Sequence, residues 1–228
     1  MTTLPQGDAK TRQVRSMFDA IAGRYELVNR LMTFGLDARW RRRLVADLRL
    51  ARGSVVLDVA AGTGDLSREL ARQGLRPIAT DLSFNMLAHA HDVAHRVQSD
   101  ALTLPFARAS VDGVTCGYAL RNFTDLAGTL AEIGRVVRPG GRIAILEVAE
   151  PRRGLWRAGF RLWFRRVVPL LGGLLSDRPA YRYLPASTAY LPDAAGIAAL
   201  LREAGFSAVN HRVILGGLSQ QFVATRRA

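Results

Sequence analysis

The first fifty residues carry apolar side chains at three- and four-residue spacing, which predicts helices. Phe18, Ile21 and Tyr25 share one side of the first predicted helix, and a second helical run covers residues 37–48. From Gly53 onward, short apolar runs alternate with helical segments. This change of pattern predicts a helical N-terminal region followed by an α/β region.

Strands and helices are expected in regular alternation after Gly53. The expected strands are residues 55–59, 77–80, a run that ends near 99, 113–118 and 142–148; the expected helices are 65–73, 84–90 and a segment capped by Thr124 or Asp125 that runs to 137. We expect Pro139-Gly140-Gly141 to end this last helix. Residues 193–205 then predict one more helix, and residues 208–225 a hairpin that turns at Gly216-Gly217. Such alternation gives a parallel sheet with helices on both faces, and ligands bind beyond the carboxyl ends of its strands.

Polar residues follow the first three strands at that edge. The first strand leads into Gly62-Thr63-Gly64, whose glycines let a ligand approach the backbone at the start of a helix. The second ends in Asp81, which can accept from both hydroxyls of a ribose, and the third in Asp100-Ala101, which can accept from an adenine amino group. A dinucleotide site would have a third glycine where Ser67 stands. Each aspartate alone is more often a helix cap, but together these features predict an adenosine ligand without a pyrophosphate.

Several longer segments are similar to one family of enzymes. They are Tyr25-Glu-Leu-Val-Asn29-Arg30, Gly35-Leu-Asp37-x-x-Trp40-Arg41-Arg42, Leu57-Asp58-Val-Ala-Ala-Gly62-Thr63-Gly64-Asp65, Leu104-Pro105-Phe106, Leu120-Arg121-Asn122, Arg135-Val-Val-Arg-Pro139-Gly140-Gly141-Arg142 with Glu147, and Tyr181-x-Tyr183-Leu184. On these segments the sequence resembles the ubiquinone/menaquinone-biosynthesis C-methyltransferases, which are class I S-adenosylmethionine-dependent methyltransferases. The glycine loop and Pro-Gly-Gly are shared by many methyltransferases, whereas the Tyr25 segment and Leu-Arg-Asn are much more specific to this family.

The resemblance implies a Rossmann-like α/β fold with a seven-stranded, mostly parallel sheet and helices on both faces. We expect one domain with four parts: an N-terminal helical lid (1–52), a cofactor-binding core (53–150), a substrate-side helical insert (151–192), and a helix and hairpin that complete the core (193–228). No metal is expected, because His89, His91 and His95 have no cysteine nearby and favour a solvated helix face.

The resemblance also implies S-adenosylmethionine as the cofactor. The contacts of the family fall on Thr63, Asp81, Asp100, Ala101 and Gly117, where many members have serine at the last position. Glycine there removes a hydroxyl but keeps the backbone. With the neighbouring positions, the expected cofactor-binding set is Asp58, Gly62, Thr63, Gly64, Asp81, Leu82, Asp100, Ala101 and Gly117.

The family adds a methyl group to a ring carbon of a reduced quinone, so its site must make that carbon nucleophilic. Loss of a phenol proton places negative charge on the ortho carbons, and a phenol has a pKa of about 10. Arg121 supplies a fixed charge for the developing oxyanion, and Asn122 and Tyr25 would orient a hydroxyl or a water. The resemblance implicates these three residues, and Asp37 is a candidate for a further orienting carboxylate. The plainer alternatives are that Arg121 only pairs with Asp125 or Asp37, and that Asn122 only begins a helix.

Composition narrows the class of protein. A chain of 228 residues with 49% apolar residues fits one globular domain and excludes a disordered chain. Cys116 is the only cysteine, which excludes an internal disulfide and favours a cytoplasmic location, and it stands in an apolar strand as a buried small hydrophobe. No apolar run reaches the roughly 20 residues of a membrane-spanning helix. The formal net charge of +13 permits nucleic acid or phospholipid as a partner, but 31 of the 32 basic residues are arginine, which favours a general coding bias.

The insert has a character of its own. In residues 152–176, Arg153, Arg157, Arg161 and Arg165 are spaced by four and form one stripe on a predicted helix, and aromatic residues cover much of the rest. A basic amphipathic helix with tryptophans suits peripheral contact with the anionic inner face of the cell membrane. A lid packed on the sheet with a solvated arginine edge is the alternative. Both place apolar surface near the strand ends, as a polyprenylated substrate requires.

We therefore expect S-adenosylmethionine-dependent C-methylation of a reduced polyprenyl quinone ring, with demethylmenaquinol to menaquinol favoured. Many relatives read Gly-Gly-x-x-Ala-x-His at the last hairpin, where this chain has Gly216-Gly217-Leu-Ser-Gln-Gln-Phe222, and Glu26 replaces the usual aspartate after Tyr25. These departures keep open C- or O-methylation of another aromatic, polyketide-like acceptor. A nucleic-acid methyltransferase or binding protein is disfavoured, because the fourth strand leads into Arg121-Asn122-Phe123 and not into Asn-Pro-Pro-aromatic. A homodimer is a further hypothesis.

Overall fold

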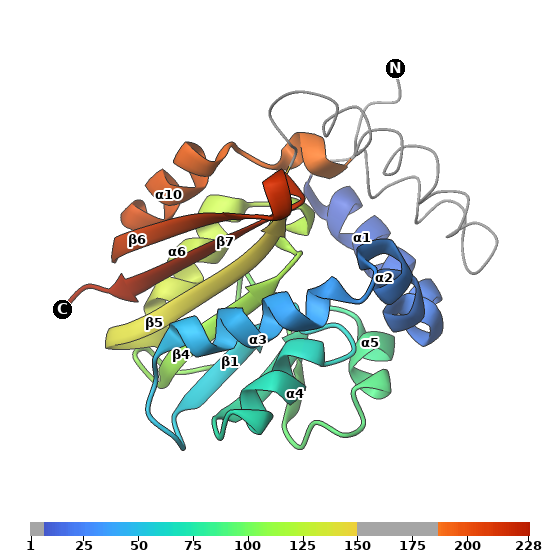
Figure 1. Cartoon of the computed structure of the whole chain (residues 1–228), viewed down its shortest axis with the longest axis horizontal. Coiled ribbons are helices and arrows are strands. Elements are labelled where there is room, and N and C mark those ends of the chain that lie inside the picture. The colour runs from blue at the N-terminus through green and yellow to red at the C-terminus, as the bar shows by residue number, and fades with distance from the viewer. Residues whose placement is uncertain (1–6, 150–186) are drawn as a thin grey trace.

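A computed structural model of the chain describes residues 7–149 and 187–228, and within them a seven-stranded sheet forms the centre of the molecule (Figure 1). Its strands are β1 (Val55–Val59), β2 (Arg76–Asp81), β3 (Arg96–Gln98), β4 (Val111–Gly117), β5 (Val137–Val148), β6 (Phe206–Ile214) and β7 (Ser219–Arg226). Their order is β3-β2-β1-β4-β5-β7-β6; β7 pairs antiparallel with both β5 and β6, and the other pairings are parallel. The expected mostly parallel, seven-stranded α/β sheet is confirmed.

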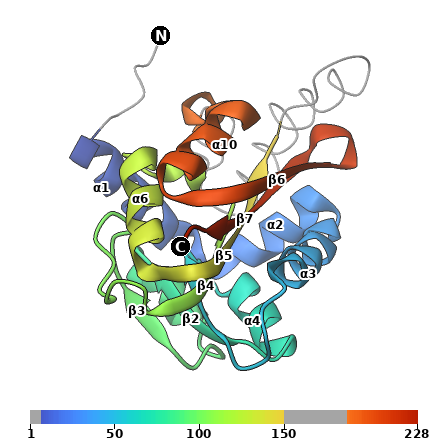
Figure 2. The ribbon, with the colours of Figure 1, turned by 90° about the vertical axis from the view of Figure 1, so that its left-hand side faces the viewer.

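Helices cover both faces of this sheet. They are α1 (Gly7–Ile21), α2 (Tyr25–Thr33), α3 (Leu36–Leu48), α4 (Asp65–Arg72), α5 (Phe84–His89), α6 (Leu126–Val136) and α10 (Ala194–Glu203), with short 3-10 turns η1 (Ala22–Arg24), η2 (Leu120–Asn122), η4 (Thr188–Tyr190) and η5 (Leu215–Gly217). Figure 2 shows α6 and α10 on one side and α3 and α4 on the other. Successive side chains of a strand point to opposite faces of the sheet, so each strand presents side chains to the helices on both faces.

The central strands show this alternation clearly. In β5, Ile143 and Ile145 pack with α6 and α10, whereas Ala144 and Leu146 pack with α3 and α4. Both sets are fully buried. A strand that is apolar at every position is what a sheet covered on both faces requires. Cys116 in β4 is likewise fully buried, as expected.

Two local expectations were wrong. Pro139-Gly140-Gly141 was expected as a loop before a strand at 142, but β5 begins at Val137, directly after α6. Val111 pairs with Val137 and Gly113 with Arg142, so residues 138–141 form a bulge within the strand. Tyr25 was expected on the same helix as Phe18, but η1 interrupts that helix, and Tyr25 begins α2.

The other predicted elements are present with ends shifted by a few residues. β1 has the predicted bounds, and Ser83 caps α5 by accepting from Met86 N at 3.1 Å. Of the two cap candidates for α6, Asp125 is the one that accepts from the Gly128 N–H, at 2.8 Å. The terminal hairpin turns in η5, at Gly216-Gly217.

The arginine stripe of residues 152–176 lies outside the described residues, as does Tyr181-x-Tyr183-Leu184. In the described ranges, no helix is long and apolar enough to cross a bilayer.

Candidate active site

A pocket lies at the carboxyl ends of the strands, beside the point where the chain passes from the β1–β3 half of the sheet to β4. Such a switch point is where open α/β sheets bind ligands. One wall comes from the strand ends and includes Val59, Thr80, Asp81, Asp100 and Gly117. The opposite wall comes from the N-terminal helices and includes Thr11, Val14, Arg15, Phe18 and Tyr25. The pocket therefore joins the two regions that the sequence pattern separates.

The turn after β1 lies against the pocket, and its glycines adopt left-handed backbone conformations. Gly62 lines the pocket with a φ of +57°, and Gly64 follows with a φ of +90°. At Gly64 a Cβ would lie 2.8 Å from Cγ2 of Val93, so a larger residue would collide there. Gly64 thus allows close packing at the start of α4, whereas Gly62 faces the pocket.

Asp81 at the end of β2 is held by two backbone donors. Its Oδ2 accepts from Gly62 N and its Oδ1 from Ser83 N, each at 2.8 Å. Burial raises the pKa of the Asp81 carboxyl to about 6, although the N–H groups of Ser83 and Gly62 lower it. The carboxyl is therefore ionised at neutral pH. Each oxygen keeps a lone pair for a hydroxyl donor in the pocket.

Asp58 does not face the pocket as Asp81 does, although the sequence predicted both as cofactor-binding residues. Asp58 is fully buried and accepts from Ser67 Oγ at 2.7 Å and from Thr115 Oγ1 at 2.9 Å. Burial raises its pKa to about 6. Asp58 therefore links β1 to α4 and to β4 inside the fold, and it does not line the pocket.

The expected cofactor set divides accordingly. Gly62, Asp81, Leu82, Asp100, Ala101 and Gly117 line the pocket, whereas Asp58, Thr63 and Gly64 are not among its lining residues. At Gly117 a Cβ would lie 2.8 Å from Leu66 Cδ1, the end of a flexible side chain, so the serine of many relatives would require Leu66 to move.

Tyr25 and Asn122 line the acceptor side of the pocket. The Tyr25 ring meets Phe18 edge-on, with centroids 6.0 Å apart. Burial raises the pKa of the Tyr25 hydroxyl, while a hydrogen bond with Asn29 and the charge of Arg121 lower it. The two residues come from different parts of the fold, Tyr25 from α2 and Arg121 from η2.

Arg121 itself is only 5% exposed and is not among the lining residues. Its Nη1 lies 2.5 Å from Oε1 of Glu147, near the end of β5. The alternative partners, Asp125 and Asp37, were wrong: Asp125 caps α6, and Asp37 lies in another cluster. Glu147 belongs to the segments that carry the resemblance, but it was not predicted as the partner of Arg121, because no local pattern joins positions 26 apart.

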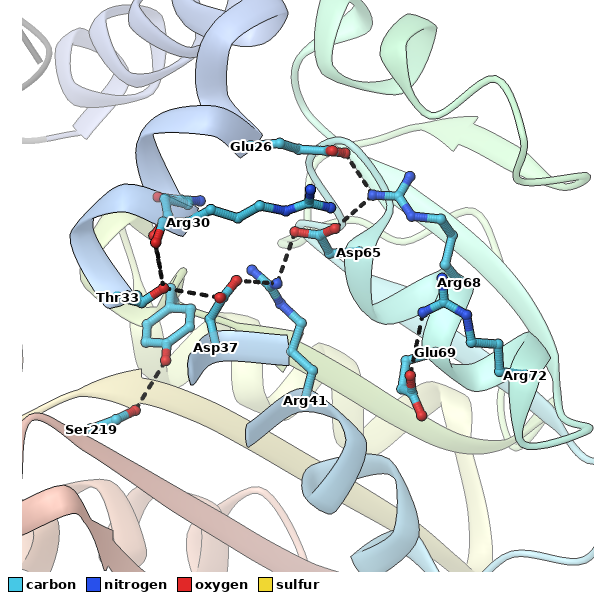
Figure 3. Close-up of polar contacts among 12 residues, drawn as sticks. Glu26, Arg30, Thr33, Asp37, Arg41, Asp65, Arg68, Glu69, Arg72 and Ser219 are labelled. Atoms are coloured by element: carbon cyan, nitrogen blue, oxygen red, sulfur yellow. Dashed lines mark hydrogen bonds and ion pairs between the residues drawn. The ribbon is translucent and has the colours of Figure 1, made fainter. Parts of the chain in front are cut away.

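Asp37 is buried in a cluster of ion pairs that joins α2, α3 and α4 (Figure 3). It accepts from Thr33 Oγ1 at 2.9 Å and pairs with Arg41, which also pairs with Asp65 at 2.9 Å. Arg68 extends the cluster by pairing with Asp65 and Glu26, each at 2.6 Å. The structure therefore brings Asp37 against Arg41 and not into the pocket.

Unsatisfied polar atoms mark the pocket as a place for a polar ligand. In the described part of the chain, five buried side-chain polar atoms have no hydrogen-bond partner. Three of them are at this site: Ser99 Oγ and Asn122 Oδ1 belong to lining residues, and Arg121 Nε lies behind Asn122. Buried polar atoms are nearly always hydrogen-bonded in native proteins, so a ligand with donors and acceptors fits this pocket.

Some site residues had no signal in the sequence. Ser99 follows a predicted strand, but its contribution depends on how β3 aligns with β2. Tyr118 lines the pocket in a left-handed conformation, with a φ of +59°, and its hydroxyl is 3.2 Å from Ser219 Oγ. Thr11, Val14 and Phe18 share one face of α1, which the helical spacing could have indicated.

The remaining candidate residues stand apart from this chemistry. His89 Nδ1 lies 2.8 Å from the carbonyl of Asn85 within its own helix. In residues 7–149 and 187–228, no three His, Cys, Asp or Glu side chains gather in a way that would hold a metal ion.

Comparison with known proteins agrees with this geometry. The profile of the ubiE/COQ5 methyltransferase family matches residues 6–226. The chain belongs to this family. It is 41% identical to the demethylmenaquinone methyltransferase of Thermus thermophilus over 92% of this chain and 100% of that one. It is 35% identical to the ubiquinone/menaquinone biosynthesis C-methyltransferase UbiE of Geotalea uraniireducens over 95% and 97% of the two chains.

A solved structure supports the fold. The crystal structure of an S-adenosylmethionine-dependent methyltransferase from Thermotoga maritima, a possible histamine N-methyltransferase, superposes with a TM-score of 0.67 at 16% identity and covers 94% of this chain and 100% of that one. As a member of the ubiE/COQ5 family, this protein is an S-adenosylmethionine-dependent methyltransferase. The glycine turn, the Asp81 carboxylate and the unpartnered Ser99 hydroxyl fit that cofactor, because it offers hydroxyl, amino and carboxylate groups.

Proposed function

We propose that the protein methylates a ring carbon of a reduced polyprenyl quinone, with demethylmenaquinol as the acceptor and menaquinol as the product. The single observation that carries the proposal is that Tyr25 and Asn122 line the same pocket as the strand ends that fit the cofactor, with Arg121 next to Asn122 in the turn η2. The relatives named above are called demethylmenaquinone or ubiquinone/menaquinone methyltransferases, which supports a quinol acceptor.

On the cofactor side, we assign Asp81 to the ribose hydroxyls and Asp100 with Ala101 to the adenine. Gly62 and Gly117 present backbone without a side chain, so they leave room for the methionine part of the cofactor. Asp58 acts indirectly, because it fixes β1 to α4 and β4 through Ser67 and Thr115. Bound S-adenosylmethionine supplies a methyl group that is already electrophilic.

On the acceptor side, the protein has to favour the phenolate over the phenol. The Arg121 guanidinium stabilises negative charge on the acceptor oxygen, because its own charge is fixed and water is excluded from its surroundings. Asn122 presents an unpartnered oxygen that orients an acceptor hydroxyl or a water. We assign Tyr25 to orienting the same hydroxyl or water from the N-terminal side of the pocket.

Asp37 contributes through Arg41 and not by contact with the acceptor. Arg41 joins Asp37 on α3 to Asp65 at the start of α4, and Arg68 continues from Asp65 to Glu26 beside Tyr25. We assign this cluster to fixing α2, and hence Tyr25, against the glycine turn. The N-terminal helices then form the lid of the pocket.

Methyl transfer to reduced demethylmenaquinol, followed with isotopically labelled S-adenosylmethionine, tests the proposal. Labelled menaquinol with the methyl group on a ring carbon is the expected product, and the oxidised quinone should accept no label because it has no phenol proton to lose. Transfer to oxygen, or cofactor binding without transfer to any quinol, would contradict the proposal. In the β6–β7 hairpin, Gln220 and Phe222 stand where many relatives have alanine and histidine, so a panel of other hydroxylated aromatics belongs in the same experiment.

A further inference from the structure

Glu147 is a fully buried carboxylate directly behind the acceptor side of the pocket. It is the last residue but one of β5, and three donors converge on it. Its Oε2 accepts from Leu120 N at 2.8 Å, and its Oε1 accepts from Arg121 Nη1 at 2.5 Å and from Val148 N at 2.8 Å. One side chain thus holds both the backbone and the guanidinium of the turn η2.

Stability alone does not explain a charge at this position. The neighbours Leu120 and Leu146 are almost fully buried and apolar. A buried ion pair is often no more stabilising than apolar residues of the same volume, because both charges lose their hydration. What Glu147 provides that an apolar residue cannot is a fixed geometry for its donors.

The turn that Glu147 holds carries the acceptor side of the pocket. Ala119 and Asn122 line the pocket on either side of Arg121. In the described residues, Glu147 is the hydrogen-bond acceptor for the Arg121 guanidinium, and Arg121 Nε is buried without a partner. The position of the guanidinium therefore depends on Glu147.

We propose that Glu147 is a positioning residue for methyl transfer. It fixes η2 so that Arg121 and Asn122 meet the acceptor in one geometry, and it acts through them without touching the acceptor. The inference rests on the proposed function, because it requires Arg121 to act on the acceptor oxygen.

A matched control exists at the other end of the sheet. Asp112, near the start of β4, accepts from Val55 N at 2.6 Å and pairs with Arg138 at 2.7 Å. It therefore makes contacts of the same kind, with one backbone donor instead of two and one arginine, in a less buried position away from the strand ends that line the pocket. Asp112→Asn reports what the loss of such a carboxylate does to the fold alone.

The experiment compares Glu147→Gln, Arg121→Met, the double variant and Asp112→Asn in turnover with the quinol acceptor. Glu147→Gln should lower kcat by about 100-fold, the order of effect that follows a misplacement of about 1 Å at a reacting centre. The KM for S-adenosylmethionine and the thermal shift on its addition should stay unchanged. In the double variant, Glu147→Gln should add almost nothing to the loss already caused by Arg121→Met, because residues that act as a unit are not additive. Asp112→Asn should keep the kcat of the unmodified protein.

Hydrogen exchange gives a readout that does not depend on turnover. The amide of Leu120 should exchange faster in Glu147→Gln, whereas amides of β1 should not. If Glu147→Gln does not fold, Glu147→Asp replaces it: the charge remains, but the side chain is one methylene shorter, and the same fall in kcat is expected.

Each failure has a distinct meaning. Wild-type kcat in Glu147→Gln beside a slow Arg121→Met overturns the inference and leaves the proposed function standing. Multiplicative losses in the double variant, or a matching loss in Asp112→Asn, also overturn it, since both indicate a general effect on the fold. Unchanged turnover in Arg121→Met overturns the role of Arg121 in the proposed function. If no quinol is methylated, unchanged exchange at Leu120 in Glu147→Gln would still overturn the positioning role.

Discussion

The two walls of the pocket are built by different means. On the wall that we assign to the cofactor, backbone groups near the ends of strands hold the side chain that faces the pocket, as where Gly62 N and Ser83 N both donate to Asp81. On the side that we assign to the acceptor, Tyr25 and Asn122 present their side chains, and the neighbouring Arg121 is held by Glu147 from a distant strand. Backbone geometry follows from the fold class, whereas side-chain pairing belongs to the individual chain. The comparison explains how one cofactor site can serve many acceptors.

The largest expected effect is on kcat, and it distinguishes the two walls because a change on the cofactor wall should alter the affinity for S-adenosylmethionine instead. Asn122→Ala should lower kcat by about 100-fold, the magnitude seen when one stabilising hydrogen-bonding group is removed at an oxyanion. Its Oδ1 has no partner in the described protein, so the melting temperature should not fall. Steady-state kinetics and a thermal melt check both statements. A weaker affinity for S-adenosylmethionine with unchanged kcat would place Asn122 on the cofactor wall instead.

A change on the opposite wall should give the opposite result. Asp81→Asn should weaken S-adenosylmethionine binding by roughly 10- to 100-fold, because a hydrogen bond to a charged acceptor contributes about 1.5–3 kcal/mol. At saturating cofactor, kcat should recover. Isothermal titration calorimetry measures the affinity, and Asp58→Asn is the control, since Asp58 is a fully buried aspartate that does not line the pocket.

The pH dependence of the affinity for S-adenosylmethionine tests the same contrast between the two walls. Burial raises the pKa of Asp81 to about 6 in the free protein, and hydroxyl donors of the cofactor favour its ionised form. Binding therefore releases a proton below about pH 6, and affinity should be constant above that pH and fall by at most about tenfold per unit below it. The dependence should be absent in Asp81→Asn. Any pH dependence that remains in Asp81→Asn would come from Asp58, because burial also raises the pKa of Asp58 to about 6.

The smallest effect is expected at Ser99. Ser99→Ala removes a buried hydroxyl that has no partner in the described protein, so the fold should lose no stability. A neutral hydrogen bond contributes about 1 kcal/mol, so the Kd for S-adenosylmethionine should rise by roughly fivefold. Titration with the cofactor checks this. An unchanged Kd would mean that the Ser99 hydroxyl does not contact the cofactor.

Much of the cofactor wall could be predicted from the sequence, and most of the acceptor wall could not. Asp81 and Asp100 were found because they follow parallel strands, whose carboxyl ends always meet at one edge. The same rule also selected Asp58, although its side chain turns into the sheet. The partner of Arg121 was wrong, since pairing between η2 and β5 depends on sheet order and register, which no local spacing encodes.

The sequence by itself determined the family and its sheet through motifs shared with relatives, and it determined the strand–helix alternation and the glycine turn because periodicity and glycine positions act over a few neighbouring residues. Only the tertiary structure decided that Asp37 pairs with Arg41, that Tyr25 starts a new helix beside the pocket, and that Glu147 holds Arg121. These are contacts between elements far apart in the chain. The energy of such a contact depends on the distance between the two groups and on their burial, and both are set only when the sheet and its helices pack together.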